Sequence, residues 1–125
     1  MDASQTKTKV GLTVLIPVYN EVENILAMYR QVTDVMEQFS RSYEIIYVDD
    51  GSNDGGCELM KSLAEQDSRV KLVFFRRNYG QTAAMHAGLQ MATGDAIVTL
   101  DGDLQNEPAD IPMMIEKLDE GYDLV

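Results

Sequence analysis

Residues 12–18 read Leu-Thr-Val-Leu-Ile-Pro-Val, an almost unbroken apolar run that leads into the polar residues Tyr19, Asn20 and Glu21. A strand with one face in water alternates apolar and polar side chains, whereas a strand covered on both faces does not. Residues 96–100, Ala-Ile-Val-Thr-Leu, show the same pattern. Residues 44–49 and 70–75 are further short runs rich in Val, Ile and aromatic side chains. These runs predict four strands, of which the first and the last are covered on both faces.

Apolar residues at helical spacing lie between the predicted strands. Ile25, Tyr29, Val32 and Met36 form one stripe, which predicts a helix over residues 22–38. Asn20 and Glu23 are spaced as a capping box at its start. Similar spacing predicts helices at 59–64, 81–91 and 111–118, and residues 122–125 resemble the start of a fifth strand. The helix over 81–91 is small and apolar nearly all round, which predicts close packing against the sheet.

The alternation of strand and helix predicts an α/β fold. Crossover connections between parallel strands are right-handed, so the pattern implies an open, mostly parallel sheet with helices on both faces. The length of 125 residues suits one domain, which we place at residues 10–125. Residues 1–9 are polar and are predicted to form a disordered N-terminal arm.

Charge and cysteine content exclude several classes of protein. The chain has 10 Lys and Arg against 21 Asp and Glu, and its formal charge of −11 repels nucleic acids and anionic lipid surfaces. Cys57 is the single cysteine, so the chain has no internal disulfide, and a cytoplasmic location is predicted. No apolar run reaches the roughly 20 residues of a membrane-spanning helix. We therefore expect a folded protein that does not bind nucleic acid.

Polar residues follow each predicted strand, and in a parallel sheet these strand ends meet at one edge, where ligands bind. After the fourth strand, Asp101 and Asp103 point to one side, with Gln105 in phase behind them. Oxygen ligands in this pattern predict a site for Mg²⁺ or Mn²⁺. The alternative is that the two aspartates only end the strand.

The other strand ends leave similar alternatives open. Asp50 is suited to accept hydrogen bonds from a base or ribose, while one of Ser52, Asn53 or Asp54 caps the next helix. Glu21 either binds a ligand or complements a helix dipole. Arg76 and Arg77 either contact phosphate or form a solvated pair. His86 is interpreted as a packing or surface residue, and Cys57 as inert.

Four segments together resemble the family 2 glycosyltransferases of GT-A fold, in the branch that transfers sugars to polyprenyl phosphates. They are VLIPVYNE (14–21), EIIYVDDGSNDG (44–55), FFRRNYGQTAAMHAGLQMATGD (74–95) and VTLDGDLQNEP (98–108). The most specific signal is Gln105 after the Asp-Gly-Asp motif, followed by Pro108. The resemblance covers almost the whole chain and corresponds to the N-terminal half of the catalytic domain.

The resemblance implies a metal-dependent glycosyltransferase that moves a sugar, with inversion, from a nucleotide-sugar donor to a lipid phosphate at the cytoplasmic face of a membrane. It implies that Asp103 and Gln105 hold Mg²⁺ or Mn²⁺ with Asp101 close by, and that Asp103, through the metal, and Asp101 are catalytic. The nucleotide-sugar-binding residues that it implies are Pro17, Tyr19, Glu21, Val48, Asp50, Arg77, Gln81, Asp101, Gly102 and Asp103.

Two other interpretations remain open at this point. Relatives in the family continue beyond residue 125 with the acceptor-binding elements, so the chain is alternatively a non-catalytic nucleotide-sugar-binding fragment. A nucleotidyltransferase shares the layered fold and an aspartate-bound metal, but it needs a Gly-rich triphosphate loop after the first strand, where this chain has Pro17 to Glu21. An incomplete sheet edge would also allow self-association with a second copy.

Overall fold

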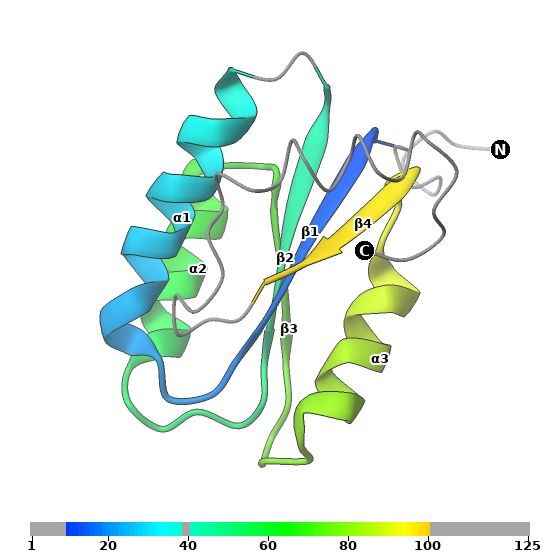
Figure 1. The fold of residues 1–125 in the computed structure, drawn as a ribbon. Helices are drawn as coiled ribbons and strands as arrows, with labels where there is room; N and C mark the ends of the chain where they lie inside the picture. The colour runs from blue at the N-terminus through cyan, green and yellow to red at the C-terminus, as the bar shows by residue number, and fades with distance from the viewer. Residues whose placement is uncertain (1–9, 39–40, 101–125) are drawn as a thin grey trace, which may run out of the picture.

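A computed structural model describes residues 10–38 and 41–100, which form a four-stranded parallel sheet between two layers of helices (Figure 1). The chain order alternates strand and helix as predicted. The elements are β1 (Leu12–Val18), α1 (Val22–Glu37), β2 (Tyr43–Asp49), α2 (Gly56–Gln66), β3 (Val70–Phe74), α3 (Gln81–Met91) and β4 (Ala96–Thr99). The α/β fold prediction is therefore confirmed over these residues.

The strand order β3-β2-β1-β4 places the first strand inside the sheet and reverses the direction in which the chain proceeds. From β1 the chain moves outward to β2 and β3, and then it crosses back to place β4 on the other side of β1. Because each crossover is right-handed, α1 and α2 lie on one face and α3 on the other (Figure 1). The reversal falls between β1 and β4.

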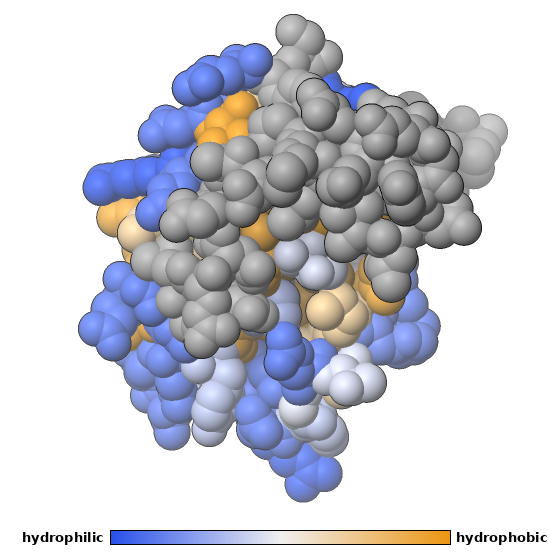
Figure 2. All heavy atoms as spheres, in the orientation of Figure 1, coloured by the Kyte–Doolittle hydropathy of each residue, from blue (hydrophilic) through white to orange (hydrophobic). Residues whose placement is uncertain are grey.

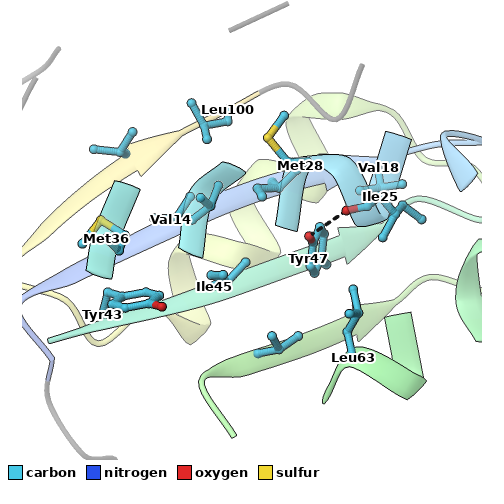
Figure 3. Close-up of a cluster of buried hydrophobic side chains, with 14 of the residues drawn as sticks. Val14, Val18, Ile25, Met28, Met36, Tyr43, Ile45, Tyr47, Leu63 and Leu100 are labelled. Atoms are coloured by element: carbon cyan, nitrogen blue, oxygen red, sulfur yellow. Dashed lines mark hydrogen bonds between the residues drawn. The ribbon is translucent and has the colours of Figure 1, made fainter. Parts of the chain in front are cut away.

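The larger core lies between the sheet and the pair α1 and α2. Side chains of alternate strand residues, such as Val14 and Ile45, meet Ile25 and Met28 of α1 in this layer (Figure 3). The Tyr47 hydroxyl donates a hydrogen bond to the Ile25 carbonyl oxygen at 3.4 Å, which satisfies the polar end of an otherwise buried ring. The apolar stripe on α1 predicted from the sequence is the face that is buried here.

The smaller core lies under α3 and depends on residues with little or no side chain. Leu15 and Val48 of the sheet pack against Ala84 of α3. At Gly88 an added Cβ would overlap the Leu15 side chain, so only glycine lets the helix lie this close to β1. The predicted close packing of this helix is confirmed on its inner face. Its outer face is open instead, since Leu89 is 45% exposed.

The prediction that residues 96–100 are covered on both faces is wrong in the described part of the chain. Ile97 is 36% exposed and Thr99 is also exposed, whereas Val98 and Leu100 on the other face are buried. The reason is that α3 packs against β1 and β2 and not chiefly against β4. Elsewhere on the face shown in Figure 2, hydrophilic side chains dominate the described surface, in keeping with the high acidic content.

The predicted capping box at the start of α1 is also wrong. Asn20 has a left-handed backbone conformation (φ 52°), and the residue before the helix is Glu21, whose side chain caps no amide. The first helical amide, that of Val22, instead donates to Asp54 Oδ2 at 2.9 Å. The other oxygen of Asp54 accepts the Gly56 amide at 3.0 Å, so one carboxylate serves the first residues of both α1 and α2.

The remaining predictions about secondary structure fall on residues that the structure does not describe. These are the arm at 1–9, the helix at 111–118 and the strand that begins at 122. Among the described residues, no helix is both long and apolar enough to cross a membrane.

Candidate functional site at the carboxyl edge of the sheet

The carboxyl ends of β1 and β4 lie side by side where the sheet reverses direction. Leu100, which follows β4, donates its amide to the Leu15 carbonyl oxygen at 3.0 Å and so continues the pairing of the two strands. α1 follows β1 and covers one face of the sheet, while α3 precedes β4 and covers the other face. In open α/β sheets, ligands bind outside the carboxyl ends of the strands at such a reversal. Tyr19 follows β1 at this place and is 48% exposed. The sheet topology therefore indicates the same edge, at the carboxyl ends of the strands, that the positions of the polar residues predicted.

The loop after β1 is fastened to the loop after β2 by reciprocal hydrogen bonds. The Asn20 amide donates to Ser52 Oγ at 2.8 Å, and the Asn53 amide donates to Asn20 Oδ1 at 2.9 Å. The left-handed conformation of Asn20 is what lets its backbone and side chain face the same neighbour. Beside it, the Glu21 carboxylate accepts a hydrogen bond from Asn24 Nδ2 at 2.8 Å.

The carboxylate of Asp50 organises the loop after β3. It is 4% exposed, and it accepts the Tyr79 amide at 2.7 Å on Oδ1 and the Gly80 amide at 2.9 Å on Oδ2. Asn78 Nδ2 donates to the same Oδ2 at 2.9 Å and to the Asp50 carbonyl oxygen at 3.2 Å. The buried negative charge is thus met by three donors of one short loop.

Gly51 brings the backbone of the loop after β2 (the second loop) into direct contact with the backbone of the loop after β3 (the third loop). Its φ of +82° is unfavourable for any residue with a side chain, and an added Cβ would lie 2.5 Å from the Asn78 amide nitrogen. Glycine is therefore required here on two independent grounds. Together with the bonds of Asp50 and Asn20, this contact joins the three described loops of the edge into one unit.

Arg77 and Tyr79 form an exposed part of the loop after β3. The Arg77 guanidinium lies 5.0 Å from the centre of the Tyr79 ring, and that ring meets Phe75 edge-on at 5.6 Å. Tyr79 is 55% exposed. The contacts hold a positive charge and an open aromatic face at the edge, which are suited to anionic and planar ligands respectively.

Asp49, the last residue of β2, lies next to this edge and is bonded to Cys57 of α2. The Cys57 thiol donates to Asp49 Oδ2 at 3.3 Å, and the Ser52 amide donates to the same oxygen at 3.1 Å. Burial, together with the hydrogen bond to Asp49, raises the pKa of the Cys57 thiol to about 11. The thiol therefore stays protonated at neutral pH, which agrees with the interpretation of Cys57 as inert.

The structure describes seven of the residues predicted to bind the nucleotide sugar. Five of them lie on the loops of the edge or where these loops join a strand or helix: Pro17, Tyr19, Glu21, Arg77 and Gln81. Asp50 is buried among the loop amides, and Val48 is fully buried in the smaller core. His86 lies on the exposed side of α3, away from these loops. The roles assigned to the seven residues stay predictions.

The predicted metal ligands Asp101, Asp103 and Gln105 lie outside the described residues, as does Gly102. Within residues 10–38 and 41–100, no group of three His, Cys, Asp or Glu side chains is arranged to hold a metal ion. The described carboxylates at the edge have other partners: Asp50 is bonded to loop amides, Asp54 to helix amides and Asp49 to Cys57.

Three residues join the loops of the edge in a way that the sequence did not predict: Asn20, Ser52 and Asn78. Sequence spacing predicts only helix caps for Asn20 and Ser52, and it predicts no role for Asn78. Their residue types favour turns, because short polar side chains hydrogen-bond nearby backbone. That signal predicts a bond to the residue's own loop. The partners here lie about 30 residues away in sequence and become neighbours only when the sheet forms.

Comparison with known proteins shows what this chain is similar to. The family model described as "Glycosyl transferase family 2" matches residues 13–125. The undecaprenyl-phosphate 4-deoxy-4-formamido-L-arabinose transferase of Salmonella choleraesuis (strain SC-B67) is 47% identical over 115 residues, which cover 91% of this chain. The same-named protein of Salmonella typhimurium is 46% identical over 115 residues. This chain spans only 35% of the length of these relatives.

Solved structures share the fold. A mannosyltransferase from Pyrobaculum calidifontis, in complex with GDP-Man and Mn²⁺, superposes with a TM-score of 0.64 at 26% identity and covers 82% of this chain and 30% of its own. A glucosyl-3-phosphoglycerate synthase from Mycobacterium tuberculosis, in complex with UDP, gives a TM-score of 0.68 at 23% identity, over 90% of this chain and 41% of its own. The second likeness concerns the fold alone.

Proposed function

The chain belongs to glycosyl transferase family 2, and from that premise we propose that it carries the donor and metal site of a glycosyltransferase that acts on a polyprenyl phosphate. The observation that carries the proposal is the joined set of loops at the carboxyl edge, beside the point where the sheet reverses. Its relatives are named for sugar transfer to undecaprenyl phosphate. The donor is a nucleoside diphosphate sugar, as in the mannosyltransferase structure with GDP-Man.

The described loops supply contacts that a nucleotide sugar needs. Tyr19 and Tyr79 offer aromatic surface to a base, while the Arg77 guanidinium offers a positive charge to the diphosphate. Asp50 has three of its roughly four acceptor positions occupied, which leaves one for a ribose or base donor. The loops are held to one another before any ligand arrives, so binding costs less ordering of the chain.

The metal site belongs to the residues that directly follow β4. Asp101, Asp103 and Gln105 provide carboxylate and amide oxygens, which suit Mg²⁺ or Mn²⁺. They fit the role because the described carboxylates at the edge are already engaged with amides or with Cys57. A divalent ion bound there would offset the negative charge that grows on the departing diphosphate. We place Asp103 and Gln105 as the residues that hold it, with Asp101 close by.

The acceptor chemistry needs no additional base. The phosphate of a lipid acceptor has a second pKa near ~6, so at neutral pH it is already an anionic nucleophile. Its oxygen attacks the anomeric carbon as the bond to the diphosphate breaks, and a single displacement of this kind inverts the configuration. The acceptor is presented at a membrane surface, and we place the chain at the cytoplasmic face.

A titration calorimetry experiment tests donor binding. UDP-sugars and GDP-sugars are titrated into the chain with and without Mn²⁺, and we expect at least one of them to bind only when the metal is present. Asp103→Asn should weaken this binding about tenfold or more while the circular dichroism spectrum stays unchanged. Glu65→Gln, the same change of charge on the exposed surface of α2, is the matched control. Absence of metal-dependent binding by every donor would contradict the proposal.

A transfer assay separates the enzyme from a binding fragment. The second candidate is a nucleotide-sugar-binding module without transfer activity. Radiolabelled donor is incubated with undecaprenyl phosphate vesicles, and labelled lipid is extracted. Transfer supports the enzyme, whereas tight donor binding without labelled lipid supports the fragment. Sedimentation of the same sample tests self-association through a sheet edge.

A further inference from the structure

We infer that Asn78 is a positioning residue for donor binding, because its side chain fastens the loop that carries Arg77 and leads into Gln81 onto the buried carboxylate of Asp50. The inference rests on the proposed function. It adds a residue that neither the motif pattern nor the family resemblance assigned. It also gives Asp50 a role in shaping the site in addition to any contact with the nucleotide.

The geometry around Asn78 is that of a clamp. Its Nδ2 donates at 2.9 Å to Asp50 Oδ2 and at 3.2 Å to the carbonyl oxygen of the same residue. One side-chain amide therefore grips both the backbone and the side chain of Asp50. The next two amides, of Tyr79 and Gly80, complete the set on the carboxylate. Hydrogen bonds to a buried charge are short and directional, so they restrict the path of the loop.

The clamp lies between the two donor-binding residues predicted on this loop. Arg77 precedes Asn78 directly, and Gln81 begins α3 directly after Gly80. The backbone at Arg77 and Asn78 also contacts Gly51, so the loop is fixed from its other side as well. Because the loop is held at residues 78–80, the backbone at Arg77 and Gln81 is positioned before a ligand binds. Without the clamp, a ligand would have to order the loop as it binds.

The position of Asn78 separates this role from a purely structural one. Asn78 is exposed and contributes nothing to either apolar core, while Asp50 beneath it is buried. Removal of its side chain takes away a local tether but leaves the bonds from the Tyr79 and Gly80 amides in place. The expected effect is therefore a loosened loop on an intact fold.

Two variants and a matched control test the inference. Asn78→Ala removes the clamp, and Asn78→Asp keeps the size of the side chain but turns its donor into an acceptor that faces the Asp50 carboxylate. Gln66→Ala removes an exposed amide side chain at the far end of α2. Binding of UDP and of GDP is measured by calorimetry with Mn²⁺ present. Hydrogen exchange of the Tyr79 and Gly80 amides and urea unfolding are measured on the same samples.

We expect both Asn78 variants to bind nucleotide about tenfold more weakly, with faster exchange at Tyr79 and Gly80. The urea midpoint should fall only modestly, because the buried Asp50 carboxylate loses one of its three donors, and both variants should stay fully folded without urea. Gln66→Ala should match the wild type. Equal affinity in the wild type and both Asn78 variants overturns the inference and leaves the proposed function intact. A loss of affinity in variants that are already partly unfolded without urea also overturns it, since the role is then structural. If the wild type binds neither nucleotide, the proposed function fails and the inference fails with it.

Discussion

Arg69 donates two side-chain hydrogen bonds to the carboxylate of Asp67, from Nε to Oδ1 at 2.9 Å and from Nη2 to Oδ2 at 2.9 Å. The Tyr29 hydroxyl donates to the same carboxylate at 2.7 Å, and the guanidinium lies 4.5 Å from the centre of the Tyr43 ring. The cluster joins α1, α2, β2 and β3 at the end of the sheet opposite the candidate site. It therefore affects the stability of the fold without belonging to the binding edge.

The Asp67–Arg69 pair makes stability depend on pH in a defined direction. The hydrogen bonds from Arg69 lower the pKa of Asp67 from 3.8 to about 2 in the folded chain. A carboxyl with a lowered folded-state pKa stabilises the fold above its unfolded pKa and loses that contribution as the pH falls toward the folded value. Asp67→Asn should thus lower the free energy of unfolding by about 2 kcal/mol at pH 7. The difference from the wild type should shrink as the pH falls from about 4 toward 2.

Urea unfolding of the two proteins at a series of pH values measures this difference. The comparison cancels the effect of the other acidic residues, which titrate alike in both proteins. Tyr29→Phe, which removes one neutral donor to the same carboxylate, should cost less than Asp67→Asn. A difference between wild type and Asp67→Asn that stays constant down to the lowest pH would contradict the role given to the pair.

Gly51 and Gly55 provide a matched test of the contact between the second and third loops. Both have positive φ, of +82° and +89°, so an alanine at either position strains the backbone by about 1 kcal/mol. An added Cβ at Gly51 meets the backbone of Arg77 and Asn78, whereas nothing lies within 4 Å of one at Gly55. Gly51→Ala should therefore lower the unfolding free energy by clearly more than Gly55→Ala. It should also weaken nucleotide binding, whereas Gly55→Ala should not; equal effects of the two changes would contradict the contact.

The sequence predicted the layers of this fold better than the connections at its edges. Apolar runs and helical stripes depend on burial, which is repeated along each element, so their bounds agree with the structure within a few residues. Polar residues inside the strands gave no such signal. Thr13 and Glu44 interrupt two apolar runs, and they turn out to be paired, with the Thr13 hydroxyl donating to Glu44 Oε2 at 2.7 Å. Pairing of this kind depends on strand register, which spacing along the chain does not reveal.

The candidate site shows the same division. Its location at the carboxyl edge follows from topology alone, and so does the choice of Asp50 and Arg77 as residues of that edge. Spacing along the chain missed that Asn20 binds the loop after β2 and not its own helix, whose first amide is bonded to Asp54 from that other loop. Asn20 could either cap its own helix or bond the loop after β2, and this second partner is near only once the sheet has formed.

The close approach of α3 to the sheet is open to a rescue experiment. Gly88→Ala would push a methyl group into the Leu15 side chain, and we expect a loss of about 1–3 kcal/mol in unfolding free energy from this overpacking. Leu15→Ala alone leaves a cavity and also destabilises, by about 2–5 kcal/mol. In the double variant the new methyl group enters the space left by Leu15. Calorimetric or urea unfolding should therefore show a double variant more stable than the sum of the single losses predicts; strict additivity would mean that the two residues do not meet.

Cys57 gives a chemical test of the region behind the edge. With a pKa raised to about 11 by burial and by Asp49, the thiol should react slowly with iodoacetamide at pH 8. Only about one thiol in a thousand is ionised there, against about one in ten for a thiol of pKa 9. The alkylation rate, followed by mass spectrometry, should rise steadily up to about pH 11. Asp49→Asn removes the negative charge beside the thiol and should speed labelling at pH 8 by several-fold. Glutathione labelled in parallel is the control for the chemistry of the reagent. If wild-type Cys57 reacts as fast as glutathione, the thiol is neither buried nor bonded to Asp49.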